Sequence, residues 1–352
     1  MLLGRATPEA TTRYAARHGT WKQTGFYRET PLGTVSSLGI GTYLGEMTWE
    51  ADTAYVEAIL TAIRGGINFI DTSLNYRNQK SERAIGQAIL RLIESPKEVD
   101  RDEFAVCTKA GYLVRGATPE KMPSEDVVGG MHSMAPVFLA DQLGRSRVNL
   151  GLETIDVFYL HNPETQLGFL SHEEFHDRLR LAFRFLEQAV AEQTIQFYGA
   201  ATWEGFRKPH ALSLTKMEEI AREIAGAGHH FRFVQLPLNL AMPEAFTSRH
   251  EDLNGSAVTV LEAAEALGLT VVASASILQS RLSRDLPGEF AASLPGLGTD
   301  AQRAIQFTRS TPGVTTALVG MGRAAHVQEN LGLGPVPPLT RDQYSHLFRI
   351  GP

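Results

Sequence analysis

The fold is decided by a unit in residues 52–73, DTAYVEAILTAIRGGINFIDTS, in which a helix precedes a buried strand. One face of the expected helix carries large apolar side chains at four-residue spacing, namely Tyr55, Ile59 and Ile63. Asp52 or Thr53 is expected to cap its first turn. This spacing predicts a helix that packs one face against a core.

A strand is expected directly after this helix. Gly65 and Gly66 can end the helix in left-handed geometry, and the apolar run 67–70 then stops at Asp71. The same order returns in residues 256–276, SAVTVLEAAEALGLTVVASAS, where Gly268 separates helix from strand. A helix-then-strand unit that recurs along the chain predicts parallel strands joined by helices.

Short apolar runs of this kind occur eight times, with room for a helix between neighbours. They are Ser37–Gly41, Asn68–Asp71, Phe104–Lys109, Ile155–His161, Gln196–Ala201, Arg232–Pro237, Thr270–Ser274 and Thr316–Gly320. Eight units predict an α/β fold of the (β/α)8 TIM-barrel type, an eight-stranded parallel barrel. A doubly wound sheet is less favoured, because no G-x-G-x-x-G follows the first run.

The remaining residues are expected to add to a single barrel domain, 1–352. Residues 1–35 predict an N-terminal extension, with a helix over Pro8–His18 and a hairpin that caps the barrel floor. Residues 334–352 form a C-terminal tail. The polar stretch Tyr112–Ser133 is either a substrate-contacting strand-to-helix loop or a tolerated surface insertion.

Composition excludes several classes of protein. The 352 residues contain 33 basic and 39 acidic side chains, so a formal net charge of −6 argues against nucleic acid or anionic membrane as partner. The single Cys107 excludes an internal disulfide and a zinc site built on several cysteines. Since we see no secretory segment and no bilayer-spanning run, a cytoplasmic location is expected.

Four chemically useful side chains follow the expected strands. Asp71 ends the second run with Tyr76 just beyond it, Lys109 ends the third, and His161 ends the fourth. Each alone could be a helix cap, packing, a snorkelling lysine or a core histidine. Together they favour chemistry, because an ionised lysine near the barrel mouth needs a carboxylate, and Asp71 is one strand away. The ammonium is also expected to depress the pKa of a neighbouring tyrosine, making it a usable proton donor.

The chain resembles the aldo-keto reductases and, within that family, a bacterial branch. The resemblance runs from about Gly33 to Leu333 through GINFIDTSLNYRNQKSERAIG, VCTKAG, IDVFYLHNPE, FYGAATW, FVQLPLN and LVGMGRAAHVQENL, in that order. Its most specific part is the family's catalytic tetrad, matched by Asp71, Tyr76, Lys109 and His161.

The resemblance implies an NAD(P)H-dependent carbonyl reductase or alcohol dehydrogenase with no metal. A hydride would pass between the nicotinamide and an aldehyde, ketone or sugar. Tyr76 would act as general acid or base, Lys109 would tune it, and Asp71 would hold Lys109. His161 would orient the carbonyl or share in proton transfer. Substrate contacts would come from Trp49, Tyr76, His161 and Trp203, with Tyr43 and the loop 112–133 as further candidates.

The resemblance also implies a set of cofactor contacts. Gln235 would bind the carboxamide, residues 274–281 would lie by the phosphates, and residues 320–330 would hold the adenosine end. The full set is Gly41, Thr42, Tyr43, Asp71, Thr202, Gln235, Ser274, Leu278, Gln279, Arg281, Gly320, Gly322, Arg323, His326, Glu329 and Asn330.

Departures from the family pattern bear on cofactor choice. The usual Ser-Asn pair after the fifth strand is Ala201-Thr202, and Ser274 replaces a stacking tyrosine. The usual Lys-Ser pair and Arg at the 2′-phosphate are Gly320, Met321 and His326. Arg323 could supply the charge instead. We therefore expect NADP(H) to be preferred, with NAD(H) possible.

Other interpretations have specific weaknesses. A non-catalytic nicotinamide-binding barrel, resembling potassium-channel β-subunits, would not need an intact tetrad. A metal-dependent hydrolase would need clustered ligands at strand ends, whereas no H-x-H occurs there and His229-His230 is expected in a surface loop. A Schiff-base aldolase through Lys109 would leave Tyr76 unexplained.

Overall fold

The computed structural model describes residues 1–94, 98–209 and 211–348, and its centre is a closed barrel of eight parallel strands. The strands lie in the order β11-β12-β3-β4-β5-β6-β7-β8 around the barrel. Their bounds are β3 (Leu38–Gly41), β4 (Phe69–Asp71), β5 (Ala105–Ala110), β6 (Ile155–His161), β7 (Ile195–Ala201), β8 (Phe231–Pro237), β11 (Thr270–Ser274) and β12 (Val314–Gly320). The (β/α)8 prediction is confirmed, with strand ends displaced by at most two residues from those expected.

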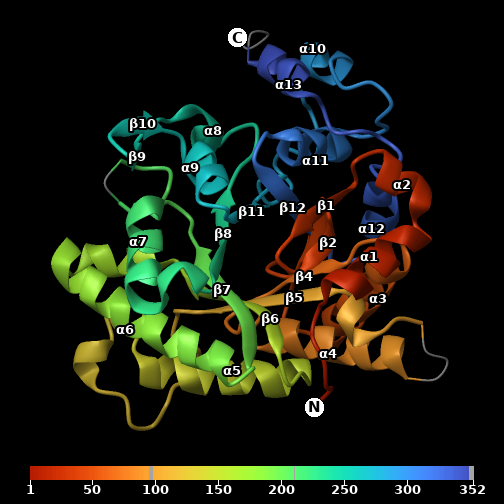
Figure 1. Ribbon diagram of the computed structural model, residues 1–352. Helices are drawn as coiled ribbons and strands as arrows, with labels where there is room; N and C mark the ends of the chain where they lie inside the picture. Colours follow the sequence, from red (N-terminus) through yellow and green to blue (C-terminus); the bar gives the residue numbers. More distant parts are fainter. Residues whose placement is uncertain (95–97, 210, 349–352) are drawn as a thin grey trace.

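Helices follow the strands and surround the barrel (Figure 1). The larger ones are α3 (Trp49–Arg64), α4 (Lys80–Ile93), α5 (Pro136–Leu150), α6 (His172–Ala191), α7 (Leu214–Ala225), α9 (Val260–Ala266), α11 (Asp300–Ser310) and α12 (Ala324–Leu331). Shorter elements are α8 (Glu244–Thr247), α10 (Gly288–Ala292), α13 (Arg341–Leu347), η1 (Arg101–Glu103), η2 (Ser124–Asp126), η3 (Pro163–Gly168) and η4 (Gly226–Gly228). The last four residues of the expected tail, 349–352, lie outside the described part of the chain.

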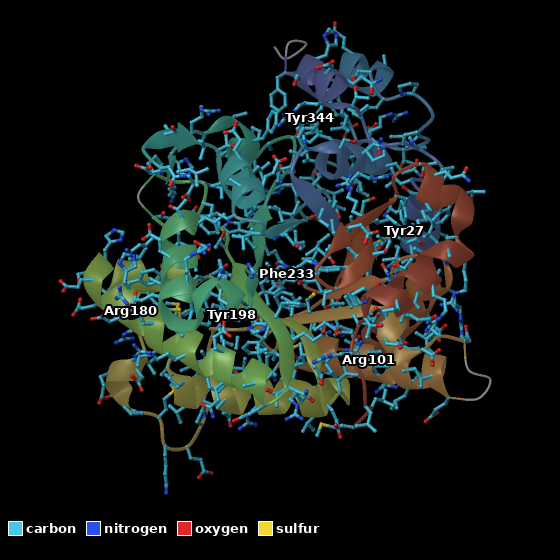
Figure 2. All side chains as sticks on the ribbon, in the orientation of Figure 1. Tyr27, Arg101, Arg180, Tyr198, Phe233 and Tyr344 are labelled. Carbon is cyan, nitrogen blue, oxygen red and sulfur yellow. The ribbon has the colours of Figure 1, made fainter. Side chains whose placement is uncertain are left out.

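Two apolar layers hold the barrel together. The larger packs the outward-facing strand residues against the helices. The smaller fills the barrel interior and includes Phe69, Cys107, Tyr159, Phe233 and Leu318. Phe233 lies near the centre of the molecule in Figure 2. Because side chains alternate along a strand, the residues two positions beyond these interior ones also point inward, at the carboxyl end of the barrel.

The opposite end is closed by the N-terminal segment, as expected. It comprises α1 (Pro8–Arg17), α2 (Gly19–Gln23) and the antiparallel hairpin of β1 (Tyr27–Thr30) and β2 (Gly33–Ser36). Leu32 and Val35 of this hairpin belong to the apolar cluster of the barrel interior. The hairpin therefore shields the barrel core from solvent on that side.

Three local expectations need correction. Helix α3 begins at Trp49 and not after Asp52 or Thr53, because the Thr48 hydroxyl accepts a hydrogen bond from Ala51 N at 3.3 Å and caps the helix earlier. His229 is buried rather than on the surface, with Nε2 3.2 Å from a Glu218 carboxylate oxygen. A hairpin of β9 (Glu251–Leu253) and β10 (Ser256–Val258) was not expected.

None of the helices in the described ranges combines the length and the apolar character that crossing a bilayer requires.

Candidate active site

Strand alternation and register bring the expected site residues together. Asp71 lies two residues beyond Phe69, Lys109 two beyond Cys107, and His161 two beyond Tyr159. In the register, Asp71 is paired with Cys107, Lys109 with Tyr159, and His161 with Ala201. The three polar side chains therefore form a layer directly above the apolar interior of the barrel.

The centre of this layer is a buried ion pair. Lys109 Nζ lies 2.5 Å from Asp71 Oδ2 and donates to Thr72 O at 2.7 Å, while Gln235 Nε2 donates to Asp71 Oδ1 at 2.8 Å. Burial raises the pKa of Asp71, against the opposing effect of the Lys109 ammonium. Burial alone would lower the pKa of Lys109, but the Asp71 carboxylate raises it above its usual range. Lys109 is therefore held as a cation.

Tyr76 lies next to this pair, but its pKa differs from the expectation. Its hydroxyl is 3.4 Å from Lys109 Nζ, and the ammonium stands 4.9 Å from the ring centroid. Burial raises the pKa of Tyr76 by more than the Lys109 ammonium lowers it. The charge of Asp71 also raises the pKa of Tyr76. The expected depression of the Tyr76 pKa is therefore wrong. Tyr76 keeps its phenolic proton and is a potential donor.

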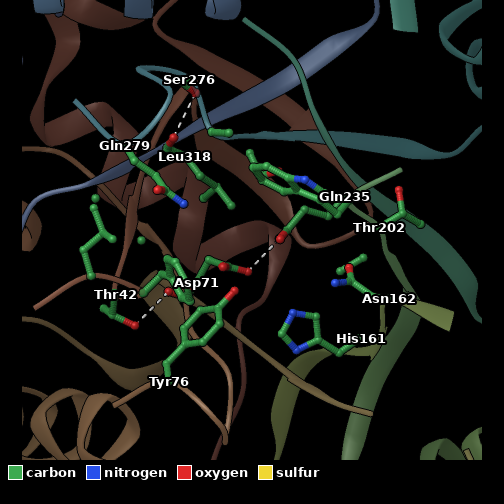
Figure 3. Close-up of a pocket in the computed structure, with 18 of the residues that line it drawn as sticks. Thr42, Asp71, Tyr76, His161, Asn162, Thr202, Gln235, Ser276, Gln279 and Leu318 are labelled. Carbon is green, nitrogen blue, oxygen red and sulfur yellow. Dashed lines mark hydrogen bonds between the residues drawn. The ribbon is translucent and has the colours of Figure 1, made fainter. Parts of the chain in front are cut away.

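His161 faces Tyr76 across the pocket (Figure 3), with ring centroids 5.7 Å apart and planes at 78°. Burial and then the charge of Lys109 hold the pKa of His161 well below its usual range, so the imidazole is neutral. Its Nδ1 lies 3.1 Å from the Ser73 hydroxyl. The single Ser73 hydroxyl proton has two other acceptors in reach, Asn75 Oδ1 at 2.6 Å and Lys109 O at 3.1 Å. Only its donation to Nδ1 leaves the ring proton of His161 on Nε2, where a donor to a carbonyl needs it.

These side chains open into a cavity of about 440 Å³ at the carboxyl end of the barrel. Of the expected site residues, its lining includes Gly41, Thr42, Tyr43, Asp71, Tyr76, His161, Thr202, Trp203, Gln235, Ser274, Gln279 and Gly320. Tyr112, from the loop 112–133, also lines it. Lys109 lies beneath the cavity, 1% exposed.

Some expected residues lie elsewhere. Trp49, the first residue of α3, is 74% exposed and does not line the cavity, because the earlier start of the helix turns it to solvent. The outer cofactor set also lies beyond the cavity lining, namely Leu278, Arg281, Gly322, Arg323, His326, Glu329 and Asn330. Arg323 is exposed at the start of α12, and Glu329 accepts a hydrogen bond from the Thr299 hydroxyl at 2.7 Å.

Several lining residues were not among those expected. They are Leu44, Asn75, Asn162 and Leu318, whereas Ala275, Ser276, Ile277 and Ser280 lie within the segment 274–281 that was expected by the phosphates. Asn75 and Asn162 adjoin Tyr76 and His161 in the chain, so their adjacency was a usable signal.

Two features suit a large polar ligand. Thr202 Oγ1 and Asn330 Oδ1 are buried and, among the described residues, have no hydrogen-bond partner. Ala275, Leu278, Gln279 and Ser280 have positive φ angles in the loop after β11. A turn of this kind can direct successive backbone N–H groups toward an anion.

The described residues contain no group of three or more His, Cys, Asp or Glu side chains placed to hold a metal ion. Among the ionisable groups of the site, Lys109 and Asp71 pair with each other, and His161 is neutral.

The barrel places a buried Lys–Asp pair beneath a tyrosine and a histidine, an arrangement suited to proton transfer. A comparison with protein-family models identifies the family. The model described as "Aldo/keto reductase family" matches residues 37–282. This chain therefore belongs to the aldo/keto reductase family.

Two curated relatives match part of the chain. One is the NADH-specific methylglyoxal reductase of Escherichia coli (strain K12), 29% identical over 145 residues, which are 38% of this chain and 41% of the relative. The other is a D-threo-aldose 1-dehydrogenase of a Pseudomonas species, 29% identical over 178 residues, 46% of this chain and 47% of the relative. The matched region thus spans less than half the length of each relative.

Solved structures share the fold over nearly the whole chain. An aldo/keto reductase from Klebsiella pneumoniae, in complex with NADP and acetate, has a TM-score of 0.64 at 20% identity and covers 92% of this chain and 95% of its own. The glycerol dehydrogenase of Gluconobacter oxydans has a TM-score of 0.67 at 18% identity, covering 92% and 94%. At these identities, the likeness establishes the fold.

Proposed function

We propose that this protein is an NAD(P)H-dependent oxidoreductase that interconverts a carbonyl compound and its alcohol, with Tyr76 as general acid or base. The observation that carries the proposal is the buried Lys109–Asp71 pair, 2.5 Å apart, under the Tyr76 hydroxyl. Family membership and the reductase and dehydrogenase names of the relatives support the same reaction class.

The residues present suit a nicotinamide cofactor. The unpaired Thr202 hydroxyl and the Gln235 amide both line the cavity, and either can bind a carboxamide. The loop from Ala275 to Ser280 offers backbone N–H groups for the phosphates. Asn330 Oδ1, buried and without a partner among the described residues, would be an acceptor for the adenosine end. When bound, the cofactor supplies or accepts the hydride.

The protein's own groups handle the charge and the proton. Negative charge develops on the carbonyl oxygen during reduction, and Tyr76 donates its phenolic proton to that oxygen. Lys109 stabilises the phenolate left on Tyr76, because the ammonium adjoins the hydroxyl. Asp71 keeps Lys109 charged and fixed. His161, neutral and opposite Tyr76, orients the carbonyl by donating from Nε2.

The substrate end of the cavity is aromatic and uncharged. Tyr43, Tyr112 and Trp203 supply rings, while Asn75 and Asn162 supply amides. The only charged side chain in the described lining is Asp71, and Lys109 neutralises it. We therefore propose a neutral carbonyl compound as substrate, bound among these lining residues, of which Trp49 is not one.

The preference between NADP(H) and NAD(H) depends on the residues beyond the cavity that are expected to hold the adenosine end of the cofactor. Arg323 is exposed at the start of α12 and available to pair with a 2′-phosphate. The similar proteins differ, since the Escherichia coli relative is named as NADH-specific and the Klebsiella pneumoniae structure is a complex with NADP. We propose a modest preference for NADP(H), with NAD(H) also accepted.

The test is an activity assay on a panel of neutral aldehydes, ketones and aldoses. Turnover is measured from nicotinamide absorbance, once with NADPH and once with NADH. Turnover of any member, abolished in Tyr76→Phe, supports the proposal. Tight nicotinamide binding with no turnover across the panel would instead favour the non-catalytic regulatory barrel. That alternative is less favoured, because both curated relatives have the names of enzymes.

A further inference from the structure

A buried histidine outside the tetrad contacts the strand end that carries His161. His132 comes from the end of the long loop after β5 and is 0% exposed. Its Nε2 lies 2.8 Å from the backbone oxygen of His161. Its Nδ1 lies 3.0 Å from the Gln166 side-chain nitrogen. A completely buried imidazole with partners on both nitrogens occupies one defined orientation.

The direction of each hydrogen bond around His132 follows from Arg178, the outermost residue of this series of contacts. Arg178 on α6 can only donate, and its Nη1 lies 3.0 Å from Gln166 Oε1. Gln166 must therefore turn its NH2 group toward His132 Nδ1, which accepts. The ring proton is then on Nε2, and it is donated to the carbonyl oxygen of His161. Burial lowers the pKa of His132 to about 4, so the neutral ring required by this arrangement persists at neutral pH.

The local backbone makes room for this bond. A Cβ atom on Gly111 would stand 2.4 Å from His161 O and 2.7 Å from His132 Nε2, so only glycine leaves the space between them open. Tyr112 and His132 form a backbone bridge that closes the loop on itself. The loop end is therefore built to bring His132 against the end of β6.

The same contacts fix one wall of the cavity. The Tyr112 ring lies edge-on between His132 and His161, with both centroid distances 5.2 Å and planes at 88° and 86°. Its hydroxyl accepts a hydrogen bond from Asn162 Nδ2 at 3.0 Å. Displacing His132 would therefore move His161, Tyr112 and Asn162, all of which line the cavity.

We propose that Arg178, Gln166 and His132 form a hydrogen-bond relay that positions His161 and the Tyr112 wall for the substrate carbonyl. His132 is a positioning residue, since it acts through His161 and not on the substrate itself. The proposal rests on the reductase function proposed above. It predicts that losing the relay misplaces the carbonyl relative to Tyr76, lowering kcat, while the cofactor contacts on the other side of the cavity are preserved.

The kinetic test compares three variants. His132→Leu should lower kcat about 10- to 100-fold with little change in NADPH affinity. His132→Gln, which retains a donor and an acceptor, should recover most of that loss. His229→Leu is the matched control, a buried histidine paired with Glu218 outside the cavity, and it should lower the melting temperature without lowering kcat. Unchanged kcat in folded His132→Leu, or no recovery in His132→Gln, would overturn the proposal.

A second measurement does not depend on turnover. Ring 15N spectra at neutral pH should assign the Nε2–H tautomer to His132, and His161 ring signals should shift in His132→Leu but not in His229→Leu. Arg178→Met breaks the outer end of the relay and serves if His132→Leu does not fold. An Nδ1–H tautomer at His132, or unmoved His161 signals in both relay variants, contradicts the relay. A wild type without turnover on any carbonyl would contradict the proposed function alone.

Discussion

Lys109 and Asp71 form an ion pair from neighbouring parts of the barrel, with Nζ 2.5 Å from Oδ2 and neither side chain more than 4% exposed. Both charges have further partners, since Thr72 O accepts from Lys109 and Gln235 donates to Asp71. A buried pair is stable only while both members are present, because removing one leaves an uncompensated charge.

The pair gives the first prediction. Lys109→Met should destabilise the fold by about 3–5 kcal/mol, because Asp71 is left buried without its counter-charge. Adding Asp71→Asn should recover much of that stability, because the remaining side chain is neutral, while activity stays lost. Denaturant unfolding of the single and double variants measures this. A single variant as stable as wild type would mean that the pair is not a buried charge pair.

Arg323 gives a prediction on cofactor choice. Arg323→Ala should weaken NADPH binding by about 1.5–3 kcal/mol, the contribution of a hydrogen bond to a charged group, and leave NADH binding nearly unchanged. Fluorescence titration with both cofactors measures the difference. Arg341→Ala, at the start of α13, is an exposed control in the same part of the chain. Equal weakening of both cofactors, or tighter binding of NADH by wild type, would show that Arg323 does not contact a 2′-phosphate.

Acid stability depends on His132. Burial lowers its pKa to about 4, so between about pH 6.5 and about 4 the unfolded chain binds a proton that the folded chain does not. Its contribution to stability is therefore complete above about pH 6.5 and is lost as the pH falls toward about 4. The loss from this group is about 2 kcal/mol at about pH 5.

Unfolding free energies measured at pH 7 and pH 5 in wild type and His132→Gln check this effect. The variant should lose less stability on acidification, because glutamine does not titrate, although His161 continues to contribute in both proteins. An identical acid dependence in the two proteins would mean that His132 is not buried as a neutral ring.

Much of the barrel could be predicted because its parallel strands are buried on both faces and are read as continuous apolar runs. The polar residues that end these runs, Asp71, Lys109 and His161, stand out for the same reason. The start of α3 was misjudged because Thr48, Asp52 and Thr53 are all acceptable caps, and only the chain path selects Thr48.

Other features depend on tertiary contacts that no local pattern encodes. His132 lies in a polar loop, and its burial arises only because the loop returns to β6. Arg77, Asn78 and Gln79 have consecutive positive φ angles directly after Tyr76, a conformation that side chains other than glycine disfavour. The pKa of Tyr76 was misjudged because its burial outweighs the neighbouring charge of Lys109.

The most direct test of the account is the rate of hydride transfer in a single turnover, with NADPH and an active carbonyl substrate, in wild type and Tyr76→Phe. The variant retains the ring and lacks only the hydroxyl that lies 3.4 Å from Lys109 Nζ. NADPH affinity should be unchanged in the variant, and the rate should be lower by at least about 10²-fold, the lower bound for losing a general acid. A rate near that of wild type would contradict the assignment of Tyr76 as the proton donor.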